Sequence, residues 1–271
     1  MRCIFCKMPS AGCISVEHIV PESLGNVDHM LPKGWVCDTC NNYFAREVEK
    51  PFLDSLYGLS SRFEMAVANK RGRIPSVIGL HPQSRTKIEL FRDLHTNNLS
   101  VAPAEGEDES RWIAAAQSNS HGTLYVPAAI LPDTNITTAR FIGKIALEIL
   151  AYRCINVPGW NEEIVDKPEL DELRHYVRSG SAKSIWPVRV RRIHPADFPF
   201  QDKNIGAYQM LHEWTILVVP ESEYFAVISI FGVEYSINLG GPEIEGYDRW
   251  LQEHVDRSPL YADAPSAQSQ A

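Results

Sequence analysis

The sequence predicts an α+β protein in which a small metal-bound module precedes a larger domain. Three observations support this fold class. Two Cys-x-x-Cys pairs, at residues 3–6 and 37–40, frame the first segment. The stretch 137–155 has the apolar period of a long helix. The apolar stretches between residues 214 and 239, separated by Pro220 and Gly232, predict an antiparallel meander.

The overall composition is that of a folded globular protein. The chain has 271 residues, of which 44% are hydrophobic and 22% are charged. No apolar run approaches the length of a membrane span, and the first residues lack the apolar segment of a signal peptide. We therefore expect a cytoplasmic protein that does not contact a membrane.

The negative charge of the chain is unevenly distributed. The formal net charge is −8, yet residues 1–75 carry nine Lys or Arg against eight Asp or Glu. The acidic excess therefore belongs to the later part of the chain, and the basic cluster at 69–73 lies at the junction. Because nucleic-acid phosphates attract positive charge, the first segment is the better candidate to meet them.

Four of the six cysteines form the two Cys-x-x-Cys pairs: Cys3, Cys6, Cys37 and Cys40. A reducing cytoplasm disfavours disulfides and favours metal thiolates. Four thiolates suit tetrahedral Zn²⁺, because each pair can turn two sulfurs towards the same ion. We expect the other two, Cys13 and Cys154, to be small buried side chains.

Each element of the first half follows from a local pattern. Residues 1–50 are rich in Gly, Pro and Asn, as expected for loops fixed by a metal. From residue 41 to 65 apolar side chains recur every three or four positions, which predicts an amphipathic helix with a kink or break at Pro51. Next come three predicted strands and an acidic loop, at 73–82, 86–93, 98–103 and 104–110.

The second half has two predicted main helices. In 137–155, an apolar stripe lies on one face while Arg140, Lys144 and Glu148 fall together on another. The second helix, 167–180, has Pro near its start and Gly at its end. A strand at 185–195, the meander, a short helix at 247–255 and a disordered tail complete the prediction. We expect three parts: 1–65, a regulatory or targeting α+β domain at 66–258, and the tail 259–271.

A distinctive motif lies between the cysteine pairs. It reads EHIVPESLGN at 17–26 and is followed by CNN at 40–42 and a predicted helix. This order resembles the HNH endonucleases over residues 3–53. The resemblance implies a ββα-metal finger with a pair of zinc knuckles outside the active site, and hydrolysis of phosphodiester bonds in DNA, with RNA left open as a substrate.

The resemblance also implies roles for single residues. His18 matches the general base, and a neutral imidazole can accept a proton from water near pH 7. Glu17 and Asn41 match the ligands of a catalytic Mg²⁺ or Mn²⁺, with Asn42 as the alternative to Asn41. Zn²⁺ would be structural. The alternatives are that Glu17 is a salt-bridge or solvated residue and that Asn41 is only a helix cap.

Two features depart from a simple match. Pro32 stands where the family commonly has its middle Asn, so Asn26 or a backbone carbonyl would have to orient His18. Adjacent residues of an ideal strand point to opposite sides, so Glu17 and His18 face the same phosphate only if the strand gives way to a loop.

The candidate contacts to nucleic-acid phosphates are basic residues of the first segment and the junction: Lys33, Arg46, Lys50, Lys70, Arg71 and Arg73. In the strand at 185–195, Arg189 and Arg191 share one face and could also meet a backbone.

Three functions fit these patterns. The first is a metal-dependent HNH endonuclease, for which the family suggests a role in bacterial antiviral defence or restriction. The second is a zinc-ribbon module that binds nucleic acid or protein without catalysis. The third is a nuclease that stays silent until its C-terminal domain binds a small molecule or a protein. Many enzymes of this kind act as homodimers, which adds a second copy to the expected partners.

Overall fold

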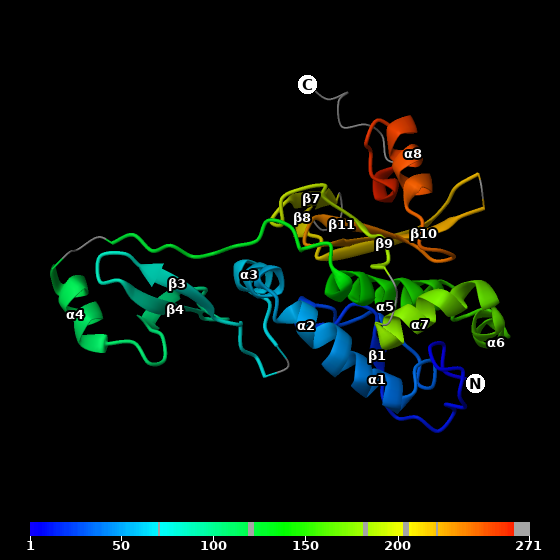
Figure 1. Cartoon of the computed structure of the whole chain (residues 1–271), viewed down its shortest axis with the longest axis horizontal. Helices are drawn as coiled ribbons and strands as arrows, with labels where there is room; N and C mark the ends of the chain where they lie inside the picture. The colour runs from blue at the N-terminus through cyan, green and yellow to red at the C-terminus, as the bar shows by residue number, and fades with distance from the viewer. Residues whose placement is uncertain (70, 119–121, 181–183, 203–205, 221, 263–271) are drawn as a thin grey trace. The chain divides into compact units, whose positions relative to one another are not determined.

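The structure is a computed structural model of the whole chain. It describes residues 1–69, 71–118, 122–180, 184–202, 206–220 and 222–262. Helices and antiparallel sheets occur together, which confirms the α+β class (Figure 1). Within these described ranges, no helix is long and apolar enough to cross a membrane.

The chain forms two compact units that do not follow sequence order. The first combines Met1–Val20, Val27–Pro51 and Asp133–Ala271, and the second combines Pro21–Asn26 with Phe52–Pro132. The N-terminal segment therefore shares its unit with the C-terminal part of the chain. The functional boundary expected near residue 65 stays a prediction.

The N-terminal segment has the predicted ββα order. Its elements are β1 (Glu17–His18), β2 (Met30–Leu31) and α1 (Asp38–Phe44), and the two strands are antiparallel. Cys37 caps α1, because its Sγ accepts a hydrogen bond from the backbone N–H of Cys40. The second cysteine pair, Cys37 and Cys40, therefore lies at the start of α1 and also offers two sulfurs to a metal ion.

The helical run continues past α1 through a π turn, η2 (Ala45–Glu49), into α2 (Lys50–Leu53). The backbone N–H of Lys50 bonds to the carbonyl of Ala45, five residues back. This wide turn directly precedes Pro51, whose ring crowds the preceding turn and which has no N–H to donate. The predicted disturbance at Pro51 thus takes the form of a π turn, and the run ends at Leu53.

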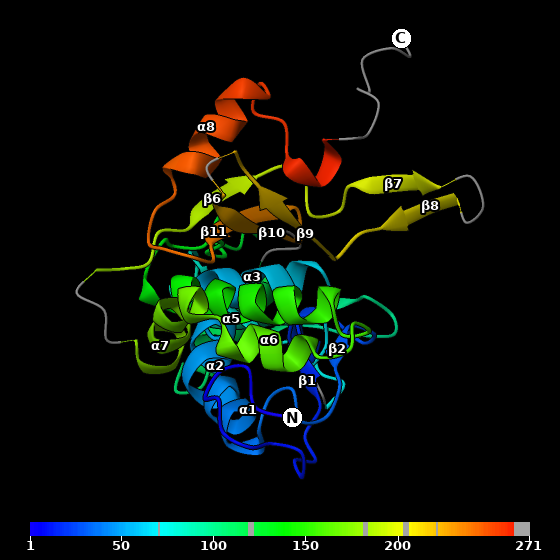
Figure 2. The ribbon, with the colours of Figure 1, turned by 90° about the vertical axis from the view of Figure 1, so that its right-hand side faces the viewer.

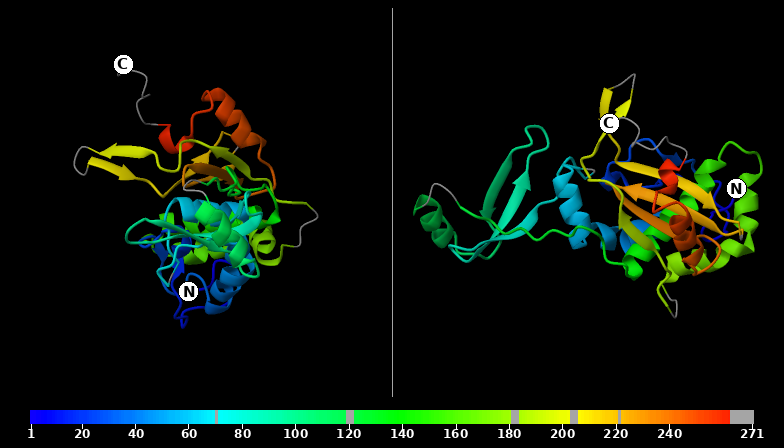
Figure 3. Two further views of the ribbon diagram at one scale, coloured as in Figure 1. Left: turned by 90° about the vertical axis from the view of Figure 1, so that its left-hand side faces the viewer. Right: turned by 90° about the horizontal axis from the view of Figure 1, so that it is seen from above.

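The second unit holds a small sheet and two helices. Its elements are η1 (Glu22–Leu24), α3 (Leu56–Glu64), β3 (Val77–His81), β4 (Thr86–Arg92), β5 (Leu99–Pro103) and α4 (Glu109–Ser118) (Figure 3). The strands lie where the sequence predicts them, and Val77, Ile88 and Leu90 form their core. The sequence predicts an acidic loop at 104–110 and misses α4, which begins at its end.

The C-terminal part builds most of the first unit. Its helices are α5 (Ile136–Arg153), α6 (Trp160–Asp166), η3 (Pro168–Leu170), α7 (Asp171–Ser179), α8 (Glu245–Glu253) and η4 (Pro259–Tyr261). Its strands are β6 (Arg189–Arg192), β7 (Pro199–Asp202), β8 (Gly206–Gln209), β9 (His212–Val218), β10 (Tyr224–Ile230) and β11 (Val233–Asn238). The order of the main sheet is β6-β11-β10-β9, which confirms the antiparallel meander.

The central strands of this sheet are covered on both faces. On one face, Phe225 and Val227 of β10 pack against Tyr247 and Leu251, both from α8. The other face lies against α5, as Figure 2 shows. All six residues of β11 are buried as a result. Burial on both faces explains why β10, whose sequence is YFAVISI, lacks a clean alternation of apolar and polar residues.

Helices α5 and α7 approach each other closely at Gly143. A Cβ atom at this position would lie 2.8 Å from a methyl group of Val177 and 3.1 Å from one of Leu173. Only glycine leaves room for this approach, since real Cβ contacts are almost never so short. The close packing keeps α5 in place between α7 and the sheet.

Two C-terminal features are absent from the sequence prediction. Helix α6 and the β7–β8 hairpin are short elements with little periodicity of their own. The expected tail, 259–271, begins with η4, and its residues 263–271 lie outside the part that the structure describes.

A buried carboxylate joins α8 and η4 to the sheet. Glu234 on β11 is 1% exposed and accepts hydrogen bonds from Arg191 (2.5 Å), Tyr247 (2.5 Å) and the hydroxyl of Ser258. We expect Glu234→Gln to lower the free energy of unfolding by about 2 kcal/mol or more, because the half-buried guanidinium of Arg191 loses its charged partner and the buried hydrogen-bond network around Glu234 is disturbed.

Urea unfolding of the zinc-loaded chain, followed by tryptophan fluorescence, checks this expectation. The matched control is Arg189→Gln, which breaks an exposed pair with Asp248 at 3.4 Å and should cost less than about 0.5 kcal/mol. Equal stability of the two variants would contradict the structural role of Glu234.

Candidate functional site

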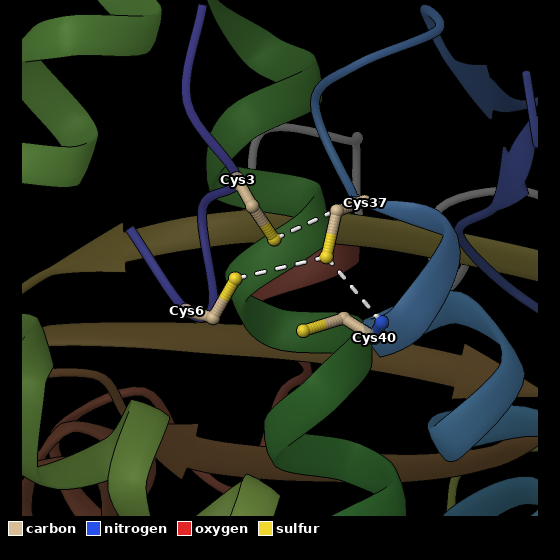
Figure 4. Close-up of side chains that lie close together, drawn as sticks. All are labelled: Cys3, Cys6, Cys37 and Cys40. Carbon is tan, nitrogen blue, oxygen red and sulfur yellow. Dashed lines mark hydrogen bonds between the residues drawn. The ribbon is translucent and has the colours of Figure 1, made fainter. Parts of the chain in front are cut away.

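The four cysteines of the two pairs converge on one point. Their Sγ atoms all lie within 4.8 Å of one another, and those of Cys6 and Cys37 are 3.6 Å apart (Figure 4). Tetrahedral Zn²⁺ with Zn–S bonds of about 2.3 Å needs sulfurs about 3.8 Å apart. The cluster therefore fits a zinc ion. Among the described residues, it is the one group of three or more His, Cys, Asp or Glu side chains whose ligand atoms lie close enough together to hold a metal ion.

The surroundings of the cluster suit thiolates. The backbone N–H of Cys37 points to Cys3 Sγ at 3.4 Å, and that of Cys40 points to Cys37 Sγ at the same distance. A hydrogen bond from the Cys40 thiol lowers the pKa of Cys3 to about 5, whereas burial raises the pKa of Cys6 to about 11. A divalent cation would supply the positive charge that allows all four sulfurs to ionise.

The cluster is closed, as a structural metal site should be. Cys3 and Cys40 are fully or almost fully buried, Cys37 is buried, and Cys6 is half-buried. A catalytic zinc would need an open coordination position for water or substrate. The burial therefore indicates a structural role for the metal, in agreement with the predicted knuckle pair.

The cysteine module is attached to α7. The guanidinium of Arg174 donates to the carbonyl of Ile4 at 2.7 Å and also to carbonyls at the end of α6, while Lys7 pairs with Asp171. Phe5 packs edge-on against Phe44 of α1, with ring centroids 4.4 Å apart. The C-terminal part thus supports the first fifty residues by direct contacts.

The fold connects the helix of Asn41 to the residue that precedes the strand of Glu17 and His18. Glu17 and His18 form β1, opposite Leu31 and Met30 of β2. Asn41 lies on α1, and its side-chain Nδ2 donates to the carbonyl of Val16 at 3.3 Å. Helix α1 is therefore joined to the residue that directly precedes Glu17. Asn42 is exposed on the same helix.

Glu17 and His18 have different surroundings, as their alternation on a strand requires. Glu17 is buried, with 6% of its surface exposed, whereas His18 is half-buried. The carboxylate of Glu17 forms an ion pair with Lys144 of α5. Burial raises the pKa of Glu17, and the nearby ammonium opposes this rise. The salt-bridge alternative for Glu17 is thus part of the structure, while its role as a cation ligand stays a prediction.

Lys144 has two further carboxylate partners. Its Nζ lies 2.8 Å from Glu49 Oε1 and 3.0 Å from Glu148 Oε2, and 3.4 Å from the carbonyl oxygen of His18. Although burial lowers it, the pKa of Lys144 is held well above its ordinary value by these carboxylates. Burial raises the pKa of Glu148 well above its usual range.

Sequence reasoning misses this cluster. It places Lys144 and Glu148 on a polar face of the helix at 137–155, whereas both are 0% exposed in α5. The available signal is an i, i+4 pair of opposite charges inside the most apolar helix of the chain, which is unusual for a solvent-facing pair.

The predicted phosphate contacts are dispersed. Lys33, Arg46 and Lys50 are exposed in the first unit, and Arg71 and Arg73 are exposed in the second. Lys70 lies outside the described residues. At the positions discussed for the middle Asn, Pro32 is exposed and Asn26 is buried at 2% exposure.

Removal of the metal should unfold the cysteine module. We expect Cys37→Ser to lose zinc and the order of residues 1–50, because the sulfur both binds the ion and caps α1. Zinc content by elemental analysis and amide exchange check this result. Cys154→Ser, which changes a cysteine outside the cluster, is the matched control and should keep one zinc per chain. A folded, zinc-loaded Cys37→Ser protein would disprove the role of the cluster.

Comparisons with known proteins agree with the motif. A family model described as HNH endonuclease matches residues 3–57, which include all four clustered cysteines, β1, β2 and α1. Searches of curated proteins and of solved structures gave no match. The resemblance stated from the sequence is therefore confirmed for about a fifth of the chain, residues 3–57, which match the HNH endonuclease family model.

Proposed function

We propose that the protein is a metal-dependent HNH endonuclease that hydrolyses phosphodiester bonds in DNA. The observation that carries this proposal is the joining of β1 to α1. The hydrogen bond from Asn41 to the carbonyl of Val16 ties the helix of the cysteine cluster to the Glu17–His18 strand. A protein that used its zinc module only for binding would not need these three residue types in one place.

In this proposal His18 is the general base. Its imidazole accepts a proton from the attacking water, and an ordinary histidine can do so near pH 7. His18 is half-buried, so its ring can meet both solvent and a substrate at the surface of the module. The exposed Lys33, Arg46 and Lys50 of the same unit would hold the DNA backbone through its phosphates.

Mg²⁺ or Mn²⁺ is the proposed catalytic cofactor, held by Asn41 and Glu17, with Asn42 as the alternative to Asn41. When bound, such an ion supplies positive charge to the phosphate and to the leaving oxygen. Asn41 and Glu17 differ in the oxygen atoms that they offer to such a cation. Asn41 uses its Nδ2 on Val16, which leaves its oxygen for a cation. Glu17 Oε1 is paired with Lys144, so a cation would have to use its second oxygen.

The remainder of the proposal concerns partners and biology. We propose that the part after residue 65 regulates or targets the nuclease by binding a small molecule, a protein or a second copy of the chain. A role in bacterial antiviral defence or restriction, in the cytoplasm, fits the family. RNA is the alternative substrate.

Replacement of the base tests the central claim. We expect His18→Ala to slow plasmid nicking in Mg²⁺ or Mn²⁺ by at least about 100-fold, because general-base catalysis contributes about that factor. His95→Ala, on an exposed loop, is the matched control and should cut like the wild type. Equal cutting by His18→Ala would remove His18 from the mechanism. A zinc-loaded wild type without any cutting would favour the binding module or a missing activator.

Replacement of Glu17 tests the cation site. Glu17→Gln keeps an oxygen that can accept from Lys144 but removes the negative charge. We expect the Mn²⁺ concentration for half-maximal nicking to rise at least about tenfold, which corresponds to about 1.4 kcal/mol. Glu47→Gln, an exposed carboxylate paired with Arg46, is the control. An unchanged Mn²⁺ requirement would show that Glu17 serves Lys144 alone.

A further inference from the structure

One buried cation touches both elements that carry the proposed catalytic residues. Lys144 is 0% exposed, and its Nζ contacts Glu17 and the carbonyl of His18, both in β1. It also contacts Glu49, the last residue of the π turn that extends α1. A single nitrogen atom therefore relates the strand of His18 to the helical run of Asn41.

The geometry of this contact is demanding because the ammonium has no access to water. A buried charge is tolerated only where its hydrogen-bonding partners are complete. Here the carboxylates that form ion pairs with the ammonium come from three separate elements: β1, η2 and α5. Any shift of β1 relative to α5 would remove the ammonium from its carboxylate, so the position of the strand is strongly restrained.

Strand β1 needs such a restraint. It is two residues long and pairs with a strand of the same length, so its ladder offers few hydrogen bonds to fix its orientation. Lys144 donates a hydrogen bond to the backbone carbonyl of His18, which belongs to the peptide group between His18 and Ile19. It thereby restrains the direction in which the side chain leaves the strand.

The π turn contributes to the same arrangement. In a π turn the backbone accommodates one extra residue, and such turns occur often at functional sites. The turn Ala45–Glu49 ends on the carboxylate that reaches Lys144 at 2.8 Å. Without this turn, the helical run that begins at the cysteine cluster would present Glu49 in another direction.

We propose that Lys144 is a positioning residue of the nuclease. Its ammonium holds Glu17 and the backbone of His18 so that the imidazole is correctly placed for the attacking water. The inference rests on the proposed function and extends the site beyond the family segment, which ends at residue 57. The C-terminal helix α5 would then complete a site whose reacting groups all lie near the N-terminus.

The first test replaces the ammonium by an uncharged group of similar length, in the full chain. We expect Lys144→Met to lower kcat for plasmid nicking at least about 100-fold while KM for DNA changes less than about threefold, because misplacement of a catalytic group affects the chemical step. Zinc content should not change. Tyr247→Phe, which removes a hydrogen bond to the buried carboxylate of Glu234 in the same unit, should lower stability but leave kcat within about threefold of the wild type.

The second readout does not depend on activity. Amide hydrogen exchange reports local opening, and we expect exchange at residues 16–20 to accelerate at least about tenfold in Lys144→Met but not in Tyr247→Phe. If the wild type does not cut DNA, the result counts against the proposed function or points to a missing activator, and exchange alone decides whether Lys144 fixes β1. Unchanged exchange in a folded, zinc-loaded Lys144→Met protein would overturn the proposal, and so would wild-type kcat.

A milder variant covers the case in which Lys144→Met does not fold. Glu49→Gln keeps an acceptor for the ammonium but weakens its hold on the π turn. We expect kcat to fall between about threefold and tenfold with KM unchanged, together with faster exchange at residues 16–20. If a folded Glu49→Gln protein matches the wild type in both measurements, the proposal is overturned.

Discussion

The arrangement of the first unit depends on the placement of one ammonium group away from water. Lys144 emerges from the middle of α5 and is fully buried, so its charge has to be matched by oxygen atoms of the protein. The oxygens come from Glu17, Glu49 and Glu148. Each of the three carboxylates is costly to bury alone, and each is stabilised by the same cation. The cluster therefore forms only when β1, η2 and α5 are all in place.

Helix α5 can serve as this reference because it is fixed on several sides. The main sheet covers one side, α7 approaches at Gly143, and Lys144 faces the N-terminal elements. The cysteine cluster is attached to α7 through Arg174 and Lys7. A segment of about fifty residues that has little core of its own is thus supported by a metal cluster on one side and by a large domain on the other.

The two proposed metal sites are chemically distinct. The four sulfurs form a closed, soft-ligand site suited to Zn²⁺, in which Cys37 also begins α1. The oxygen donors proposed for Mg²⁺ or Mn²⁺ lie on the strand and helix that the cysteine cluster helps to hold. In the proposed mechanism, zinc would act on catalysis indirectly, through the position of Asn41, whereas the ammonium of Lys144 would act through β1.

The sequence by itself determined the local features of this protein. The spacing of the cysteines predicted the cluster, and the EHIVP motif predicted the family. An apolar period predicted α5, terminal Pro and Gly residues predicted α7, and apolar stretches separated by turn residues predicted the meander. Each of these patterns is formed by residues that are close in sequence, so it can be recognised in the sequence alone. Short elements such as α4, α6 and the β7–β8 hairpin were missed because they lack such a strong local pattern.

Only the tertiary structure decided which elements pack against each face of a helix or sheet. Periodicity placed Lys144 and Glu148 on a polar stripe, but it carried no information about the elements that pack against that stripe. Contacts between residues 17 and 144, or between Ile4 and Arg174, require the chain to return over more than a hundred residues. Whether a charged side chain faces water or a buried partner depends on how such distant segments pack together. No local sequence pattern contains this information.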